Sequence, residues 1–345
     1  MNGWKEHKWG EIATLEYGKG LANYQNDNGK YPVFGTNGKI GTSDIFLNSN
    51  PGIIIGRKGA YRGVHYSTTP FYVIDTAFYL KPKINDLDIK YAYYQLLTKD
   101  INSMDSGSAI PSTSREDFYD LNIYLPPFKE QKLIAETLTG LDDKIDLLQR
   151  QNKTLEQLAE TLFRQWFAEE ASEDWEEGKV IDLFVLQRGF DLPSQNRVEG
   201  KYPVITASGA NGFHNEYKVK APGVTTGRSG LLGEVFYIDT DFWALNTSLF
   251  IVEYKLATPL FAYFFLKSLD LASLNGGSAV PTLNRNDVHD LETQLPPKEL
   301  MQNFENIAFT FFEKIKSNNT QIKTLTQLRD SLLPKLMSGE VRVKN

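Results

Sequence analysis

The residues of this sequence that are best suited to chemistry lie in two short glycine-rich segments. One runs from Gly56 to Gly59 as Gly-Arg-Lys-Gly, and the other runs from Gly227 to Gly230 as Gly-Arg-Ser-Gly. Glycine leaves backbone N–H groups accessible, and an arginine side chain can bind phosphate or form two hydrogen bonds with guanine. Arg62 adds charge to the first segment. Both segments indicate DNA contacts, although tight hairpin turns whose arginines form surface ion pairs would give the same pattern.

Other polar and basic residues lie in similar settings, in glycine-rich loops or beside repeated turns. The loops 35–39 and 208–214 carry amide groups, which suit the edge of adenine. Asn-Gly pairs are also the commonest hairpin turns, so a structural role for these loops stays open. The candidate DNA-binding residues are Lys19, Asn37, Lys39, Arg57, Lys58, Arg62, Ser108, Arg115, Arg188, Asn211, His214, Arg228, Ser229, Ser278 and Arg285.

Catalysis and metal binding have little support. The chain has no cysteine, and its 4 histidines are scattered. The segment 125–128, Leu-Pro-Pro-Phe, resembles the Asp/Asn-Pro-Pro-Tyr/Phe loop of amino-methyltransferases, but Leu125 has no side-chain oxygen that could bind a target amine. The second copy has Lys298 in place of the aromatic residue, and the chain contains no P-loop. We expect no metal site and no catalytic activity.

The charge of the chain is unevenly distributed. Lys and Arg total 37 against 43 Asp and Glu, a net charge of -6. Between Gly18 and Lys83, however, 8 basic side chains face only 3 acidic ones. A phosphate backbone senses only charges within about a Debye length, roughly 8 Å. This region could therefore bind a polyanion in an acidic protein.

The elements that must position these residues occur twice. Lys-Tyr-Pro-Val at 30–33 returns at 201–204, a shift of 171, and Leu-Pro-Pro at 125–127 returns at 295–297, a shift of 170. Two copies of so long a unit indicate two globular modules of one fold. Within each copy, β-rich runs at 52–55, 71–74, 233–238 and 248–252 predict strands, and residues 89–101 and 259–272 predict helices.

After each double proline the pattern becomes a heptad repeat. Apolar residues recur at alternating spacings of 4 and 3 from Ile134 to Trp166 and from Phe304 to Leu336, which indicates a coiled-coil seam. The two helices can pair with each other antiparallel. In the register that best matches small with large side chains, Asn152 faces Asn318, and buried asparagine often fixes coiled-coil register. Two helices that merely cap separate domains are the alternative.

The segments that flank these helices resemble a known family. Leu125 to Ile134 reads Leu-Pro-Pro-Phe-Lys-Glu-Gln-Lys-Leu-Ile, and Ser331 to Val343 reads Ser-Leu-Leu-Pro-Lys-Leu-Met-Ser-Gly-Glu-Val-Arg-Val. Both are similar to the conserved helical regions of specificity subunits of type I restriction-modification systems. The resemblance covers essentially the whole chain. The second copy departs from it, because the segment 296–300 lacks the Glu-Gln pair.

This resemblance implies a mixed α/β fold, in which two repeated target-recognition domains are separated by two long helices that form an antiparallel coiled coil. We expect residues 1–127 and 173–297 to form the first and second recognition domains. Residues 128–172 would form the central helix, and residues 298–345 the C-terminal helix and tail. Each domain would read one half of a split DNA target, and the helices would set the unread gap.

The resemblance also implies partners. It implies that the chain binds double-stranded DNA, two methyltransferase (modification) subunits that methylate adenine at N6, and restriction subunits that cut DNA. We expect no cofactor in this chain, with S-adenosylmethionine, ATP and Mg on the partner subunits. The polar start and the lack of a long apolar stretch predict a cytoplasmic protein. The alternative is a two-domain scaffold whose coiled coil binds proteins, with only non-specific DNA contact.

Overall fold

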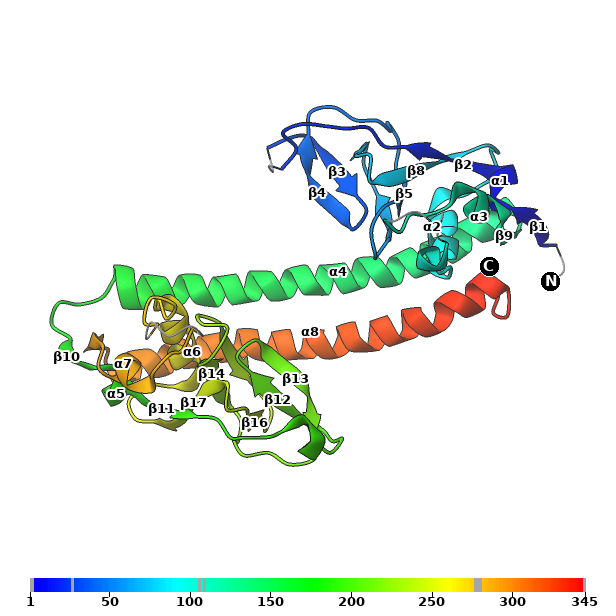
Figure 1. The fold of residues 1–345 in the computed structure, drawn as a ribbon. Coiled ribbons are helices and arrows are strands. Elements are labelled where there is room, and N and C mark those ends of the chain that lie inside the picture. The colour runs from blue at the N-terminus through cyan, green and yellow to red at the C-terminus, as the bar shows by residue number, and fades with distance from the viewer. Residues whose placement is uncertain (1–2, 26–27, 105–106, 108–109, 276–280, 344–345) are drawn as a thin grey trace. The chain divides into compact units, whose positions relative to one another are not determined.

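The computed structural model describes residues 3–25, 28–104, 107, 110–275 and 281–343. It divides the chain into two compact units. Unit 1 comprises Met1–Leu148 and Thr320–Asn345, and unit 2 comprises Gln149–Asn319. Two long helices, α4 (Phe128–Arg164) and α8 (Lys298–Ser338), each contribute residues to both units (Figure 1).

Unit 1 is a mixed α/β module packed on parts of α4 and α8. Its strands pair in the orders β1-β9, β2-β8-β5-β6 and β4-β3-β7. Its elements are β1 (Lys5–Lys8), α1 (Trp9–Ile12), β2 (Ala13–Tyr17), β3 (Tyr31–Gly35), β4 (Gly38–Ser43), β5 (Gly52–Gly56), β6 (Val64–Ser67), β7 (Tyr72–Val73), β8 (Ala77–Pro82), α2 (Ile89–Leu97), the 3-10 turn Ile101–Ser103, α3 (Arg115–Asp120) and β9 (Asn122–Leu125).

In unit 2 the equivalent strands pair in the same orders, which are β10-β18, β11-β17-β14-β15 and β13-β12-β16. This confirms the repeated α/β fold. Its elements are β10 (Glu176–Lys179), α5 (Val180–Leu183), β11 (Phe184–Arg188), the 3-10 turn Ser194–Asn196, β12 (Tyr202–Thr206), β13 (Gly209–His214), β14 (Gly223–Gly227), β15 (Val235–Ile238), β16 (Trp243–Ala244), β17 (Ser248–Tyr254), α6 (Pro259–Ser268), α7 (Arg285–His289) and β18 (Glu292–Leu295).

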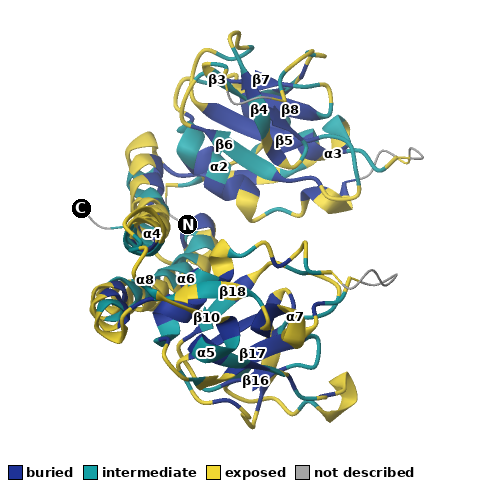
Figure 2. Cartoon of the chain, turned by 90° about the vertical axis from the view of Figure 1, so that its left-hand side faces the viewer, coloured by how far each residue is buried: buried dark blue, intermediate teal, exposed yellow. Residues whose placement is uncertain are grey.

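The core of each unit lies between its sheet and its helices. Strand β5 reads Gly-Ile-Ile-Ile-Gly and is buried throughout, as is β14 in unit 2. Figure 2 shows the buried residues concentrated in the strands and on one side of the helices, while the loops are exposed. The two long helices complete these cores, because Ile134 and Leu138 of α4 join the core of unit 1, whereas Ala159 and Phe163 join that of unit 2.

The helices predicted at 89–101 and 259–272 are present and begin where predicted, but both end earlier than predicted. Helix α2 ends at Leu97, not at residue 101, because the Asp100 carboxylate accepts hydrogen bonds from Asn102 N and Ser103 N and starts a separate 3-10 turn. Helix α6 ends at Ser268, not at residue 272, since Leu269 adopts an extended conformation. Short polar side chains at loop positions often capture backbone N–H groups in this way.

The long helices run antiparallel within each unit. In unit 1, Asp142 pairs with Arg329 of α8 at 3.0 Å, and Glu130, near the start of α4, pairs at 2.6 Å with Arg342, which lies just beyond the end of α8. In unit 2, the Asn318 amide donates to the Asn152 side-chain oxygen at 2.8 Å, and Trp166 packs against Phe304. In both units the residue number falls along α8 as it rises along α4. This confirms the antiparallel coiled coil.

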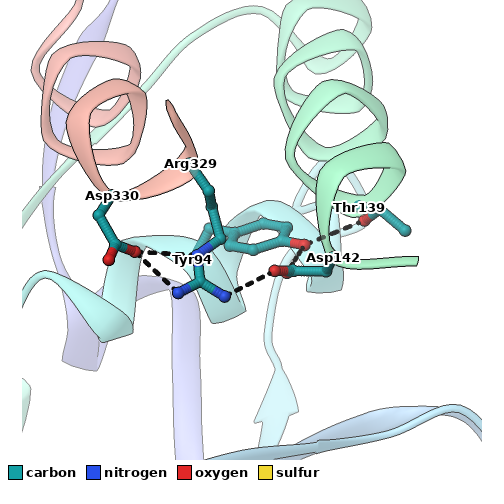
Figure 3. A network of polar contacts seen from close by, with 5 residues as sticks. All are labelled: Tyr94, Thr139, Asp142, Arg329 and Asp330. Carbon is teal, nitrogen blue, oxygen red and sulfur yellow. Dashed lines mark hydrogen bonds and ion pairs between the residues drawn. The ribbon is translucent and has the colours of Figure 1, made fainter. Parts of the chain in front are cut away.

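A polar network joins the α/β part of unit 1 to both long helices. Figure 3 shows the Asp142 carboxylate of α4 accepting hydrogen bonds from the Tyr94 hydroxyl of α2 and the Arg329 guanidinium of α8, at 2.6 and 3.0 Å. Arg329 also binds Asp330. Burial and the neighbouring Asp142 raise the pKa of Tyr94, so its hydroxyl stays a donor at neutral pH. The network fixes the place of α2 on the helices of its own unit.

The Glu-Gln pair at the start of α4 has a structural role. Gln131 is buried, and its amide donates to Asp86 O and Pro126 O at 3.0 Å and accepts from Asp88 N at 2.9 Å. It thereby holds the loop that precedes α2. The equivalent position in unit 2 is Met301, which joins the apolar core. Where the second copy lacks the Glu-Gln pair, apolar packing of Met301 therefore replaces the hydrogen bonds of Gln131.

Candidate nucleic-acid interface

The two Gly-Arg segments have the same backbone geometry. In unit 1, Arg57 N and Lys58 N both donate to Thr76 O, at 2.9 and 3.2 Å. In unit 2, Arg228 N and Ser229 N both donate to Thr247 O, at 2.8 and 3.1 Å. The arginine guanidinium is held in the same way, because Arg57 Nη1 donates to Asp75 O at 2.9 Å and Arg228 Nη1 donates to Asn246 O at 3.4 Å.

Each Gly-Arg segment pairs with a second repeated segment. Gly59 N donates to Pro111 O at 2.9 Å, and Thr113 N donates to Arg57 O at 2.8 Å. In unit 2, Gly230 N donates to Pro281 O, and Leu283 N donates to Arg228 O. This pairing brings the starts of α3 and α7, where Arg115 and Arg285 lie, towards the Gly-Arg segments. Ser108 and Ser278 lie outside the described residues.

In unit 1, the basic side chains gather around Tyr17, at the end of β2. The guanidinium of Arg57 lies over the Tyr17 ring at 4.8 Å, and that of Arg115 lies over the same ring at 5.1 Å. Lys58 approaches Asp75 at 3.9 Å. We call Tyr17, Arg57, Lys58 and Arg115 the Tyr17 cluster. The hydrogen bond to Tyr119 is the main cause that raises the pKa of Arg115, so this charge is permanent.

Unit 2 arranges its basic residues differently. Arg188 takes the position of Tyr17, is exposed and pairs with Asp191 at 3.3 Å. Arg228 is half-buried, and Arg285 is exposed at the start of α7. The Asn246 amide also donates to the Asp191 carboxylate. Among the described residues of unit 2, Arg188 therefore lies beside a carboxylate, and no aromatic ring takes the place that Tyr17 has in unit 1.

The remaining candidates lie on the loops. Asn37 and Lys39 are exposed at the β3–β4 hairpin, and Asn211 is exposed in β13. The Asn211 carbonyl accepts a hydrogen bond from Arg197 Nη1 at 3.0 Å. Lys19 is exposed just after β2, where its backbone N–H donates to Val73 O at 2.9 Å. The side chains of these four residues can reach a ligand from solvent.

Two candidates need correction because their side chains are buried. Arg62 is only 2% exposed, and its guanidinium donates to the backbone carbonyls of Gly59, Asn102 and Met104. His214 is 5% exposed, and its ring contacts the backbone of Val198 and the side chain of Trp243. The polar groups of both side chains form their contacts within the protein, so we remove both residues from the candidate DNA-binding residues.

Sequence reasoning missed Tyr17 and Tyr119. The Tyr119 hydroxyl accepts hydrogen bonds from the Arg115 guanidinium at 2.8 and 3.2 Å and from Leu15 N at 3.0 Å. Tyr119 lies four residues after Arg115, one helical turn away, and this spacing could have indicated the contact. No local signal links Tyr17 to Arg57 or Arg115, because they come from three separate elements.

The described part of the chain offers no other obvious chemical centre. It holds no group of three or more His, Asp or Glu side chains that could bind a metal ion. None of its helices is both long and apolar enough to cross a membrane.

Comparison with known proteins identifies the family. Residues 1–157 and 172–327 match the family model of the type I restriction modification DNA specificity domain. The chain belongs to this family. The two matched stretches fall on the two repeats, so the chain carries the DNA specificity domain twice.

Individual relatives agree with this assignment. The chain is 26% identical to the Type I restriction enzyme MjaIX specificity subunit of Methanocaldococcus jannaschii, over 74% of this chain and 69% of the relative. It is 23% identical to the Type I restriction enzyme HindI specificity subunit of Haemophilus influenzae, over 78% of this chain and 81% of the relative.

A solved structure has the same fold. The S subunit of a type I restriction-modification system from M. genitalium superposes with a TM-score of 0.74 at 22% identity, covering 97% of this chain and 96% of that one. The likeness extends over both repeats and both long helices.

Proposed function

We propose that this chain is the DNA-recognition subunit of a type I restriction-modification complex and that each repeat reads one half of a bipartite target. The observation that carries this proposal is the repetition of one interface. In each unit, a Gly-Arg segment pairs with the segment that leads into a short helix, and both elements carry arginine. Two such interfaces in one polypeptide suit a target made of two half-sites.

The division of labour follows from this proposal. Residues 1–127 and 173–297 act as the two target-recognition domains, and residues 128–172 and 298–345 act as the helical connection. The helices set the length of the unread gap, since their heptad seam gives a rod of nearly fixed length. The seam itself is filled by the helix pair, so partner subunits dock on the outer faces of the helices and on the adjoining domain surfaces.

The chemistry belongs to the partners in this proposal. Two modification subunits carry S-adenosylmethionine and methylate adenine at N6, whereas restriction subunits use ATP and Mg to cut DNA. This chain supplies recognition without catalysis, and the complex works in the cytoplasm, where it meets chromosomal DNA. The Tyr17 cluster in unit 1 and Arg188, Arg228 and Arg285 in unit 2 supply cations for DNA.

Methylome sequencing tests this proposal. The chain is expressed with its modification subunit in cells that lack other adenine methylation, and the modified positions are compared with those of cells without the chain. We expect a single motif made of two short half-sites separated by a fixed gap. Methylation that is absent, or unaffected by removal of the chain, contradicts the proposal. Capture of other proteins without any methylation favours the scaffold alternative.

Single Arg57→Ala and Arg228→Ala variants should each weaken DNA binding by the complex. Each change removes one cation from the DNA-facing surface, which lowers affinity by about 1–3 kcal/mol and reduces the slope of log affinity against log salt. Titration at several salt concentrations measures both quantities. Lys5→Gln is the control, because Lys5 is an exposed cation on β1, outside the interface. If both arginine variants match this control, the Gly-Arg segments do not contact DNA.

A further inference from the structure

The ring of Tyr17 is fixed in place yet open to solvent. Tyr17 pairs with Phe78 in the β2–β8 ladder, and the two rings lie 5.0 Å apart. The next residue is Gly18, where a Cβ atom would lie 2.0 Å from Ile74 O. The backbone therefore passes too close to its neighbour for any side chain at residue 18, and this contact anchors the end of β2. The Tyr17 side chain is nevertheless 48% exposed.

The two guanidinium groups over this ring are each held by one edge. Arg57 uses Nη1 to bind Asp75 O. Arg115 uses Nε and Nη2 to bind the Tyr119 hydroxyl, which is itself held by Leu15 N of β2. Within the described residues, Arg57 Nε and Nη2 form no hydrogen bond. These two N–H groups form a parallel fork of the kind that makes bidentate contacts.

The positive charge of this pair is not neutralised within the described residues. No carboxylate there forms an ion pair with Arg57 or Arg115, and the nearby Asp75 carboxylate is directed to Lys58 at 3.9 Å. Stacking over the Tyr17 ring offsets part of the cost of holding two like charges together, because the ring face is electron-rich. The arrangement is preorganised for an external group that offers paired acceptors.

Unit 2 lacks this arrangement. Its equivalent of Tyr17 is Arg188, which pairs with Asp191. Its equivalent of Tyr119 is His289. His289 Nε2 accepts a hydrogen bond from Leu186 N, just as the Tyr119 hydroxyl accepts one from Leu15 N. His289 thus keeps the contact to the strand, but Arg285 has no tyrosine hydroxyl beside it. The two repeats share a backbone frame and differ in the side chains that orient the arginines.

We propose that Arg57, held over the Tyr17 ring beside Arg115, reads guanine in the half-site of the first repeat, through the major-groove edge of a G·C pair. Guanine presents O6 and N7, two acceptors side by side, which match an arginine fork. Adenine presents a donor at N6 in the same place and is disfavoured. Tyr17 acts as a positioning residue, because it limits the conformations of both arginines. This inference rests on the proposed function of the same interface.

The test uses the full chain assembled with its modification subunits, and a library of double-stranded DNA with a randomised region. The variants are Arg57→Lys, Arg115→Lys, Tyr17→Leu and Tyr17→Phe, with Lys5→Gln as the control. Lysine keeps the charge but loses the fork. We expect the Arg57→Lys variant to lose a guanine preference in one half-site by about 10-fold, the size of one bidentate contact. The Arg115→Lys variant should lose part of this preference. Tyr17→Leu should lose part of it, and Tyr17→Phe should retain it.

The preference in the other half-site should stay unchanged in all variants, which shows that unit 2 is folded. An unchanged preference at the remaining positions of the first half-site shows the same for unit 1. A guanine preference that survives in the Arg57→Lys variant overturns the inference, as does a selected first half-site without guanine. Equal weakening on all sequences would assign the arginines to phosphate and also overturn it. In these cases the proposed function stands, because two half-sites are still selected. No sequence preference in the assembled complex without any substitution overturns both.

Discussion

Replacing Phe304 with alanine should destabilise unit 2 by about 3–5 kcal/mol, the usual cost of removing a buried phenylalanine side chain. Phe304 lies on α8, and its side chain is fully buried. It packs against Phe163 at the C-terminal end of α4, against Trp166 and Phe167 just after that helix, and against Phe264 of α6. The loss combines removed apolar contact with a cavity that these large rings cannot fill.

Phe309→Ala is the matched control on the same helix. Phe309 is 49% exposed, so its removal should cost about 1 kcal/mol or less. Urea unfolding of the full chain, followed by tryptophan fluorescence, measures both variants. Trp175 is a suitable reporter, since its ring packs against Phe167 in the same aromatic cluster. If the two variants unfold at the same urea concentration, the aromatic cluster does not hold α8 in unit 2.

Lengthening both helices by one heptad should lengthen the accepted DNA gap while leaving both half-sites unchanged. The insertions are placed between Leu148 and Gln149 in α4 and between Asn319 and Thr320 in α8, where the two units meet along the chain. One heptad adds about 10 Å of helix, equivalent to about three base pairs of DNA. A whole heptad in each helix keeps the apolar seam in phase.

Methylome sequencing of the lengthened variant gives the gap directly. The control carries the insertion in α4 alone, which puts the Asp142–Arg329 pair out of register with the Asn152–Asn318 pair or forces one helix to bulge. It should reduce both stability and methylation. An unchanged gap in the doubly lengthened variant would show that the helices do not set the spacing. Altered half-sites would show that the insertion disturbs the recognition modules instead.

The fold was largely predictable because its signals are repetitive. The heptad spacing from Ile134 and from Phe304 predicts two long helices, and α4 and α8 follow it without interruption over most of their length. The double prolines mark where the modules end. The ends of α2 and α6 were not predictable, because the competing hydrogen bonds at Asp100 and the extended conformation at Leu269 depend on local loop geometry.

The candidate site was only partly predictable, because composition does not reveal which arginines are buried. Arg62 follows the Gly-Arg segment closely in sequence, yet its guanidinium binds backbone carbonyls about 40 residues away. Arg57 and Arg115, in contrast, meet over Tyr17 through contacts between β2, the end of β5 and α3. Whether such an arginine is buried or exposed, and which residues it contacts, depends on the tertiary structure, because these residues are far apart in the sequence and close together only in the folded chain.

The split of α4 and α8 between the two units has a consequence for hybrid proteins. Ile134 and Leu138 belong to one core, and Ala159 and Phe163 belong to the other. A chimera spliced at mid-helix, after Leu148 and after Asn319, inherits each core intact from a single parent. A chimera spliced at the double prolines mixes parents inside both cores. Exchange of DNA specificity between related genes is therefore best tolerated at crossover points within the helices.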